Sequence, residues 1–267
     1  MKQAVKRILK AAVPASLRPR LKVIYSQLRY FGSAYECPFC KSHLKTFLPS
    51  GYNFAVLREK RVVGGGNRQN VQCPVCYSLD RERLLYLYLL CQTNVFTKSG
   101  RLLHIAPEEH LKQILGSHNG IDYLTADLLS PDVMVRMDIT DIQFPENSFD
   151  AIICNHVLEH VIDDYKAMTE LHRVLKPGGW AILQVPISLS LDKTYEDFSI
   201  TTARGREEAF GQDDHVRIYA KDYASRLEQA GFKVNVFNWD AVAGSFGGSS
   251  NKYGLNEDEQ IYSVVKR

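Results

Sequence analysis

The chain has 267 residues, more than the roughly 100 to 200 residues of a typical single domain. Hydrophobic residues make up 45% and charged residues 24%, and no segment contains the roughly 18 consecutive apolar residues that a membrane-spanning helix needs. These values exclude collagen-like, wholly disordered and polytopic membrane proteins. We therefore expect one core domain with an added module.

The net charge of +3 hides an uneven distribution along the chain. Residues 1–35 hold eight basic residues and no acid, whereas the rest of the chain holds 25 basic and 30 acidic residues. Apolar residues at helical spacing, with lysines opposite, predict a short basic amphipathic helix over Met1–Lys10 within a leader of residues 1–31. Such a helix can bind an anionic membrane surface through residues 1–22; the alternative is a helix that is solvated or packs on the protein.

The expected cellular location follows from the same leader. Its apolar residues do not form the uninterrupted run of a secretory signal, and no small-residue cleavage site follows them. We therefore expect a cytoplasmic protein, peripheral to the inner face of the membrane.

Four of the six cysteines form two CxxC pairs, Cys37 with Cys40 and Cys73 with Cys76. Each pair places two thiolates on one tight turn, and two such turns supply the four soft ligands of a closed tetrahedral zinc site. The 32 residues between the pairs exceed the usual spacing, so we expect an inserted hairpin or loop. No position is left open, which predicts a structural zinc ion in a module of residues 32–83. A redox or disulfide pair is the alternative.

Strands and helices alternate after residue 100, which predicts a parallel sheet with helices on both faces. A buried helix over Arg83–Gln92, within a linking segment of residues 84–99, joins the module to this domain of residues 84–267. A turn is expected at Lys176–Gly179, where the sequence reads Lys-Pro-Gly-Gly. The predicted strands are Arg101–Ala106, Tyr123–Ala126, Val133–Met137, Phe149–Cys154, Trp180–Val185, Phe232–Trp239 and Ile261–Lys266, and the predicted helices are Glu108–Leu115, Asp163–Leu175 and Lys221–Ala230.

The last two predicted strands are joined by Ala241–Gln260, which is polar and shows no helical periodicity. A parallel neighbour is usually reached through a helix, so these two strands are expected to pair antiparallel. The predicted fold class is therefore α/β, with a doubly wound, mostly parallel, seven-stranded sheet whose last strand is antiparallel, plus a small N-terminal zinc-binding module. Ligands of such sheets lie at the carboxyl ends of the strands.

Six short stretches occur in the order and at the spacing of a known family. On these stretches, residues 102–232 resemble the class I S-adenosylmethionine-dependent methyltransferases, type 11-like. The paired CPxC motifs and the stretch His104–Glu108 further resemble a bacterial subgroup found among surface-polysaccharide enzymes. The six stretches are Tyr123–Asp127, Met137–Ile139, Phe144–Asp150, Asn155–His160, Leu175–Gly179 and Gln229–Phe232.

The resemblance implies S-adenosylmethionine as cofactor, and the residue types support this. Asp127 follows the second strand, where a carboxylate can accept both ribose hydroxyls. Asp138 can accept from the adenine amino group, while the backbone of Ile139 meets the ring edge. Either aspartate could instead cap a helix or stabilise a turn.

The loop after the first strand departs from the family because it lacks glycine. Ala106 is small enough to replace one glycine in part, and Glu108 can reach the cofactor's amino group; His104 and Asn155 complete the expected cofactor contacts. S-adenosylmethionine is a cation without phosphates, so glutamates suit it and would repel the pyrophosphate of NAD. The alternative is a non-catalytic binding protein with a degenerate cofactor loop.

Two histidines are candidate catalytic residues. His156 opens the sequence His-Val-Leu-Glu-His, which matches the HxxEH motif of inverted zinc proteases. That motif belongs within a long helix, whereas here it begins at the end of a predicted strand, so we expect a pocket histidine rather than a protease. His215 lies in a predicted substrate lid of residues 187–219, in line with Arg217 and Tyr219, and could act as a general base or as an anchor of the lid.

The predicted function is methyl transfer from S-adenosylmethionine to an oxygen or nitrogen acceptor, a small molecule or a glycan, with a sugar or lipid-linked glycan suggested by the polysaccharide resemblance. A ribosomal or transfer RNA methyltransferase is the alternative. Against it, residues 32–83 mix charges of both signs and do not interleave aromatic with basic residues, so nucleic acid is not an expected partner. The sequence predicts no oligomeric state.

Overall fold

The computed structural model describes residues 14 and 16–267, so the predicted helix Met1–Lys10 lies outside the described residues. Seven strands form one sheet in the order β12-β13-β9-β8-β5-β6-β7. Strand β13 runs antiparallel to both of its neighbours, and the other neighbouring pairs are parallel, as the sequence predicted. The strands are β5 (Gly100–Ile105), β6 (Ile121–Asp127), β7 (Val135–Arg136), β8 (Phe149–Asn155), β9 (Leu175–Gln184), β12 (Phe232–Asn238) and β13 (Gln260–Lys266).

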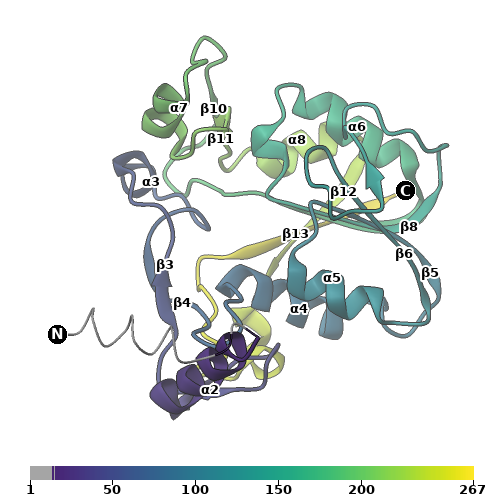
Figure 1. Ribbon diagram of the computed structural model, residues 1–267. Coiled ribbons are helices and arrows are strands. Elements are labelled where there is room, and N and C mark those ends of the chain that lie inside the picture. Colours follow the sequence, from purple (N-terminus) through teal and green to yellow (C-terminus); the bar gives the residue numbers. More distant parts are fainter. Residues whose placement is uncertain (1–13, 15) are drawn as a thin grey trace.

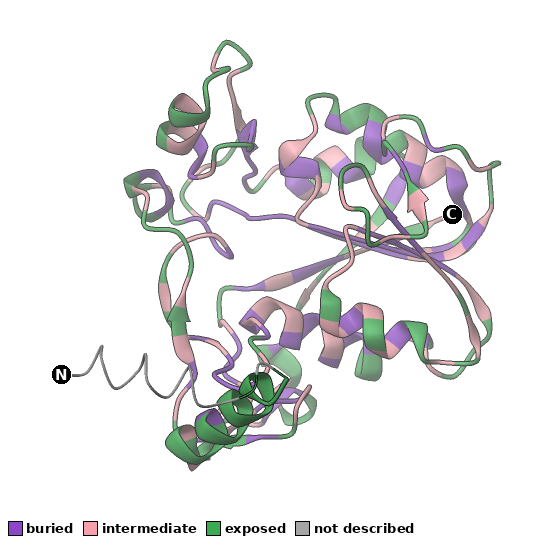
Figure 2. Ribbon diagram, in the orientation of Figure 1, coloured by how far each residue is buried: buried purple, intermediate pink, exposed green. Residues whose placement is uncertain are grey.

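Helices cover both faces of this sheet (Figure 1). Helices α4 (Asp80–Gln92) and α5 (Glu109–Gly116) lie on one face, and α6 (Asp164–Val174) and α8 (Tyr223–Gln229) lie on the other. Successive side chains of a strand point to opposite faces, so within β5 Leu102 joins the core under α4 and α5, and Leu103 joins the core under α6 and α8. The central strands are therefore buried along most of their length (Figure 2).

The N-terminal module consists of short elements with two small antiparallel sheets. Strands β1 (Phe31–Glu36) and β2 (His43–Leu44) flank the first cysteine pair. Between the two cysteine pairs lie β3 (Leu48–Ser50), α3 (Ala55–Glu59) and β4 (Arg68–Gln72), of which β3 and β4 pair with each other. This inserted hairpin is the explanation expected for the long spacing between the CxxC pairs.

Three local features differ from the sequence prediction. Helix α2 (Arg18–Tyr30) was not predicted because proline usually interrupts a helix, but Pro19 lies at its first turn, where proline is tolerated. Helix α4 begins at Asp80, where the Glu82 side chain accepts a hydrogen bond from the Leu79 amide (3.3 Å). Strand β9 already begins at Leu175, so Lys-Pro-Gly-Gly forms an irregular part of this strand, with Gly178 at a φ of +74°, rather than a separate turn.

The lid region contains β10 (Tyr195–Glu196), α7 (Ala203–Phe210) and β11 (Arg217–Ile218). Phe210 at the end of α7 packs against Val56 and Leu57 of α3, so the lid touches the N-terminal module. The Val63 amide also donates to the Ile187 carbonyl (2.8 Å). Module and lid are thus joined beside the sheet. In the part of the chain that the structure describes, no helix has the length and apolar character needed to cross a bilayer.

Candidate functional site

The loop after β5 keeps a glycine-like backbone without containing glycine. Ala106 has a φ of +47°, in the left-handed region that favours glycine, and its amide donates to the Ala126 carbonyl of β6 (2.8 Å). The chain then enters α5, with Glu108 at the N-cap position. This turn places the Glu108 side chain at the carboxyl end of the sheet.

The Glu108 carboxylate is held by two neighbours. One oxygen lies 2.9 Å from Nε2 of His104, and the other accepts from Nδ2 of Asn155 (3.0 Å). Burial acts to raise the pKa of Glu108, but the hydrogen bond and charge of His104 outweigh it, so the pKa lies below its usual value and the group is a carboxylate at neutral pH. The site therefore contains a fixed, largely buried negative charge.

The structure changes the role expected for His104. Its side chain has no exposed surface, and Nδ1 is 2.8 Å from the Tyr123 hydroxyl. Both ring nitrogens of His104 thus have partners, Nδ1 with Tyr123 and Nε2 with Glu108. His104 is thus a residue that positions Glu108, rather than one that contacts a ligand itself.

Asn155 offers an acceptor beside this carboxylate. Its Nδ2 is used by Glu108, whereas its Oδ1 is buried and has no hydrogen-bond partner among the described residues. An unpaired buried oxygen is costly, so this position suits a ligand that donates hydrogen bonds. A carboxylate and an amide oxygen together form a site of the right chemistry for an ammonium group.

Asp127 and Asp138 lie at the expected strand ends, and each also stabilises a turn. Oδ1 of Asp127 accepts from the amides of Leu129 and Ser130, both at 2.7 Å. Asp138 is exposed and accepts through Oδ1 from the amide and hydroxyl of Thr140 (both 2.8 Å), while Ile139 is buried. None of the hydrogen bonds among described residues uses Oδ2 of Asp127. The turn and ligand roles are therefore compatible in Asp127.

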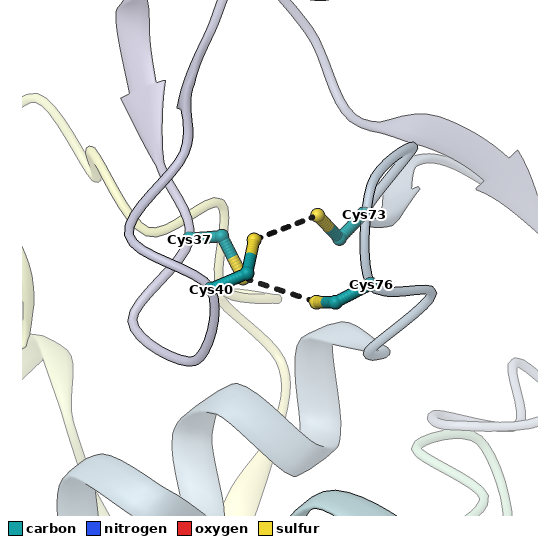
Figure 3. A group of neighbouring side chains, drawn as sticks. All are labelled: Cys37, Cys40, Cys73 and Cys76. Atoms are coloured by element: carbon teal, nitrogen blue, oxygen red, sulfur yellow. Dashed lines mark hydrogen bonds between the residues drawn. The ribbon is translucent and has the colours of Figure 1, made fainter. Parts of the chain in front are cut away.

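The four cysteines of the CxxC pairs converge on one point (Figure 3). The sulfur of Cys37 lies 3.6 Å from that of Cys76, and the sulfur of Cys40 lies 3.8 Å from that of Cys73. A disulfide would need about 2.05 Å. In a tetrahedron with zinc–sulfur bonds of about 2.3 Å, neighbouring sulfurs are about 3.8 Å apart. The cluster therefore fits a tetrahedral four-thiolate ion and contains no disulfide.

A cavity of about 580 Å³ lies between the module, the lid and the carboxyl end of the sheet. The module contributes Tyr52 and Arg68, and the start of α4 contributes Arg81. Both predicted catalytic histidines, His156 and His215, line the same cavity. The structure thus brings together two candidates that lie 59 residues apart in the sequence.

The two histidines differ in their surroundings. His156 follows β8 with a φ of +53°; its Nδ1 is 3.3 Å from a Glu159 oxygen, and its Nε2 is buried without a partner among the described residues. Burial lowers the pKa of His215 to about 4, so His215 is neutral at pH 7 but a weak base. His215 is therefore the weaker candidate for a proton acceptor, and His156 remains the other candidate.

The sequence prediction missed what Arg217 does. Its side chain is 1% exposed and donates to the carbonyls of Leu158 (2.9 Å) and Ile162 (2.9 Å), and to Glu196 of β10 (2.9 Å). Leu158 belongs to the short helix η1 (Leu158–His160) that follows His156. Arg217 therefore fixes the lid to the segment that carries the cavity residues, and does not line a substrate face.

Comparisons with known proteins concern mainly the segment from β5 to β9. Residues 101–183 match the methyltransferase domain family. The ubiquinone/menaquinone biosynthesis C-methyltransferase UbiE of Vibrio cholerae is 37% identical over 116 residues, covering 39% of this chain and 45% of that protein. The UbiE protein of Idiomarina loihiensis is 30% identical over 112 residues, covering 37% and 45%.

Among solved structures, phosphoethanolamine N-methyltransferase 2 of Haemonchus contortus in complex with S-adenosyl-L-methionine has a TM-score of 0.45 and 18% identity, covering 69% of this chain and 52% of that chain. The chain spans less than half the length of the curated relatives named above. The matched segment is similar to methyltransferase domains. It begins in β5 and ends in β9, and so contains Glu108, Asp127, Asp138 and Asn155.

Proposed function

We propose that the protein transfers a methyl group from S-adenosylmethionine to an acceptor that binds in the 580 Å³ cavity. The observation that carries the proposal is the largely buried, ionised Glu108 beside the unpaired Oδ1 of Asn155. These groups form an acceptor-rich, negative site at the carboxyl end of β5 and β8, where a cationic ligand is favoured and a pyrophosphate is not. The cofactor would supply an electrophilic methyl group on a sulfonium.

The residues of the chain have distinct tasks in this proposal. Glu108 and Asn155 would hold the cofactor's ammonium group, and Asp127 would accept from its ribose hydroxyls. Asp138 and Ile139 would meet the adenine, and the left-handed turn at Ala106 would let the backbone approach the ligand. His104 keeps Glu108 oriented. Because these groups are fixed before the ligand arrives, little ordering is needed on binding.

His156 would accept the proton that the acceptor loses. His156 lines the cavity, Glu159 fixes its ring through Nδ1, and Nε2 has no hydrogen-bond partner among the described residues. An oxygen or nitrogen acceptor remains our proposal, with a sugar or lipid-linked glycan as the substrate class. The relatives of this chain are named as quinone C-methyltransferases, which would make carbon the acceptor, but the shared segment is too short to carry that activity over.

The four-cysteine cluster would hold one structural zinc ion. All four ligand positions are filled by sulfur, so no position is open for a substrate. The ion would stiffen the module where it borders the cavity.

We also propose that the N-terminal segment contacts an anionic membrane surface. The start of helix α2 exposes the apolar side chains of Leu17 (46% exposed) and Leu21 (48%) next to basic Arg20 and Lys22. Such a surface combines the apolar and electrostatic attraction that holds peripheral proteins at anionic lipid. If the acceptor is linked to a lipid, this contact would bring the enzyme to the membrane that holds its substrate.

Calorimetry with S-adenosylmethionine and with S-adenosylhomocysteine tests the cofactor assignment, with NAD as the negative control. We expect saturable binding of both sulfur nucleosides at one site per chain and no binding of NAD. Mass spectrometry of the protein purified without added ligand should also reveal bound nucleoside. A folded protein that binds neither sulfur nucleoside would contradict the proposal and favour the non-catalytic alternative.

A further inference from the structure

A second group of metal-ligating side chains lies in the wall of the cavity. Glu159 and His160 come from helix η1, and His215 comes from the lid, 55 residues later. One ligand atom from each of the three lies within 4.8 Å of the other two. This group is separate from the four cysteines, and no residue belongs to both.

Two of these side chains have ligand atoms without a protein partner. The Glu159 side chain is 2% exposed, its Oε1 pairs with His156, and its Oε2 is buried with no hydrogen bond among the described residues. The residue His215 is 8% exposed, and none of the hydrogen bonds among the described residues uses its ring nitrogens. A buried carboxylate oxygen normally has a partner, so the unpaired Oε2 of Glu159, together with the nearby His215 ligand atom, indicates a missing ligand.

The third side chain has the orientation of a metal ligand. Nδ1 of His160 lies 3.1 Å from the Asp214 carboxylate, and its ring packs edge-on to His215 with centroids 4.7 Å apart. A carboxylate on one ring nitrogen is the usual partner of a histidine that binds metal through the other nitrogen. The Glu159 carbonyl accepts from the Val216 amide (2.9 Å), and Arg217 ties the lid to η1. The lid residue and the two η1 residues are thus held together by the fold.

From this arrangement we infer that Glu159, His160 and His215 bind a divalent transition-metal ion, with an open coordination position toward the cavity. Two imidazoles and one carboxylate suit zinc, cobalt or ferrous iron, and three protein ligands with an open side are typical of catalytic rather than structural sites. Bonds of about 2.0 to 2.2 Å would draw the three side chains closer than they lie without the ion. Ion binding stands independently of the proposed function, whereas a role of the ion in orienting the methyl acceptor rests on it.

In this inference only two residues of the HxxEH motif, Glu159 and His160, bind the ion. In an inverted zinc protease the two histidines of the motif would bind the same ion, but here His156 turns to Glu159 and its place is taken by His215 from the lid. The motif lies on a strand end and a short 3₁₀ helix, not within a long helix. The site therefore depends on His215 from the lid, and a protease role does not follow.

Cobalt titration tests the inference on the full chain. The protein is purified with zinc in the cysteine cluster, dialysed against a weak chelator, and titrated with Co²⁺ while the visible spectrum and the zinc content are recorded. We expect one further ion per chain, with ligand-field bands but no thiolate-to-cobalt charge-transfer band. His160→Ala should abolish this binding, and Asp214→Asn should weaken it roughly 10- to 100-fold. His118→Ala, which removes a histidine from another part of the domain, should bind as wild type.

Two results would overturn the inference: a wild-type chain that takes up no cobalt beyond the cysteine cluster, or a His160→Ala variant that binds cobalt as tightly as wild type. The side chains of His160 and Asp214 are 29% and 59% accessible, so we expect at least one of the variants His160→Ala and Asp214→Asn to fold. The two variants are independent tests. Calorimetry with S-adenosylmethionine on the same samples separates the two proposals. Cobalt binding without cofactor binding would reject the methyltransferase proposal alone, and the reverse would reject the metal site alone.

Discussion

His110 Nε2 donates a hydrogen bond to the backbone carbonyl of Cys76 (2.9 Å), and its Nδ1 lies 3.4 Å from the Glu82 carboxylate. His110 belongs to α5, the helix that follows the Glu108 loop, so this contact links the second cysteine pair directly to the proposed cofactor site. Phe39 from the first cysteine pair packs against the same ring, with centroids 5.0 Å apart. A structural change at the cysteine cluster should therefore alter the loop that carries Glu108.

The first prediction follows from this contact. Purified protein should contain about one zinc ion per chain in the cysteine cluster, and Cys73→Ser should remove it. Loss of a structural ion should cost several kcal/mol, and each kcal/mol lowers the melting temperature by roughly 2 to 4 °C in a chain of this size. We expect a decrease of about 10 °C together with weaker binding of S-adenosylmethionine.

Metal analysis, thermal unfolding and calorimetry check this prediction. Cys91→Ser is the matched control because Cys91 is exposed and lies outside the cluster. Protein that is free of metal after reducing purification, and as stable as the zinc-bound form, would contradict the structural role.

The second prediction concerns Glu108. Glu108→Gln keeps the shape of the side chain but removes its charge, so we expect S-adenosylmethionine to bind about 1.5 to 3 kcal/mol more weakly. Glu109→Gln changes the neighbouring exposed residue and should have little effect. Equal affinity of the Glu108 variant and wild type would remove this carboxylate from the cofactor site.

The pH dependence follows from the lowered pKa of Glu108. Because the folded pKa lies below the usual carboxyl value of about 4.3, the charge is complete above that value and is lost only as the pH falls through the lower, folded pKa. The contribution of Glu108 to cofactor affinity should thus be constant between about pH 5 and 8. A calorimetric pH series with wild type and Glu108→Gln would reveal a titration of this group as a change in the difference between their affinities.

The third prediction separates the two roles of Asp127. Asp127→Ala should weaken S-adenosylmethionine binding by about 1.5 to 3 kcal/mol. Asp127→Asn can still accept from the Leu129 and Ser130 amides through its oxygen, but its amino group then replaces the second acceptor. If the ribose uses Asp127, both variants should bind weakly although the asparagine variant keeps its turn.

Calorimetry gives the affinities, and thermal unfolding shows whether the turn is intact. Asp132→Asn, at an exposed position nearby, is the control. Wild-type affinity of Asp127→Asn would leave Asp127 with the turn role only.

The fourth prediction concerns the basic N-terminal segment. Each Lys or Arg near an anionic bilayer contributes roughly 1 kcal/mol to the binding free energy. Only some of the eight basic residues in residues 1–35 can face the surface together. Full-length protein should therefore bind anionic vesicles weakly and in a salt-sensitive way, and neutral vesicles not at all. Deletion of residues 1–22 should abolish this binding in flotation experiments.

The RNA alternative predicts a different outcome of the same deletion. RNA retention, rather than vesicle binding, would fall, and its salt dependence would become shallower as phosphate contacts are lost. If the truncated protein floats with anionic vesicles as well as the full chain does, the segment has no membrane role.

Local patterns predicted much of the fold and part of the site. The strand around Ile152 contains a continuous apolar run at residues 151–154, and each CxxC pair has the spacing of two metal ligands, so residues that are close in the sequence were sufficient for these predictions. The cluster of Glu159 and His160 with His215 could not be predicted in this way. It depends on a contact between distant segments, in which Arg217 of the lid donates a hydrogen bond to the Leu158 carbonyl of η1. The burial of His104 was missed for a similar reason: its partner Tyr123 lies on the adjacent strand.

Arg83 has consequences for how this protein can be divided. Its side chain has no exposed surface, and it donates to the carbonyls of Val71 (2.9 Å) and Ser78 (3.0 Å) in the N-terminal module and of Tyr253 (2.8 Å) and Gly254 (2.9 Å) in the loop before β13. Its guanidinium also lies over the Phe47 ring, 3.8 Å from the centroid. A cut between residues 83 and 84 would leave Arg83 on the N-terminal fragment and remove the donor of the Tyr253 and Gly254 carbonyls on the other fragment. The N-terminal module therefore cannot be expressed alone or exchanged between proteins. Transfer of the module to another sheet would also require the loop at Tyr253.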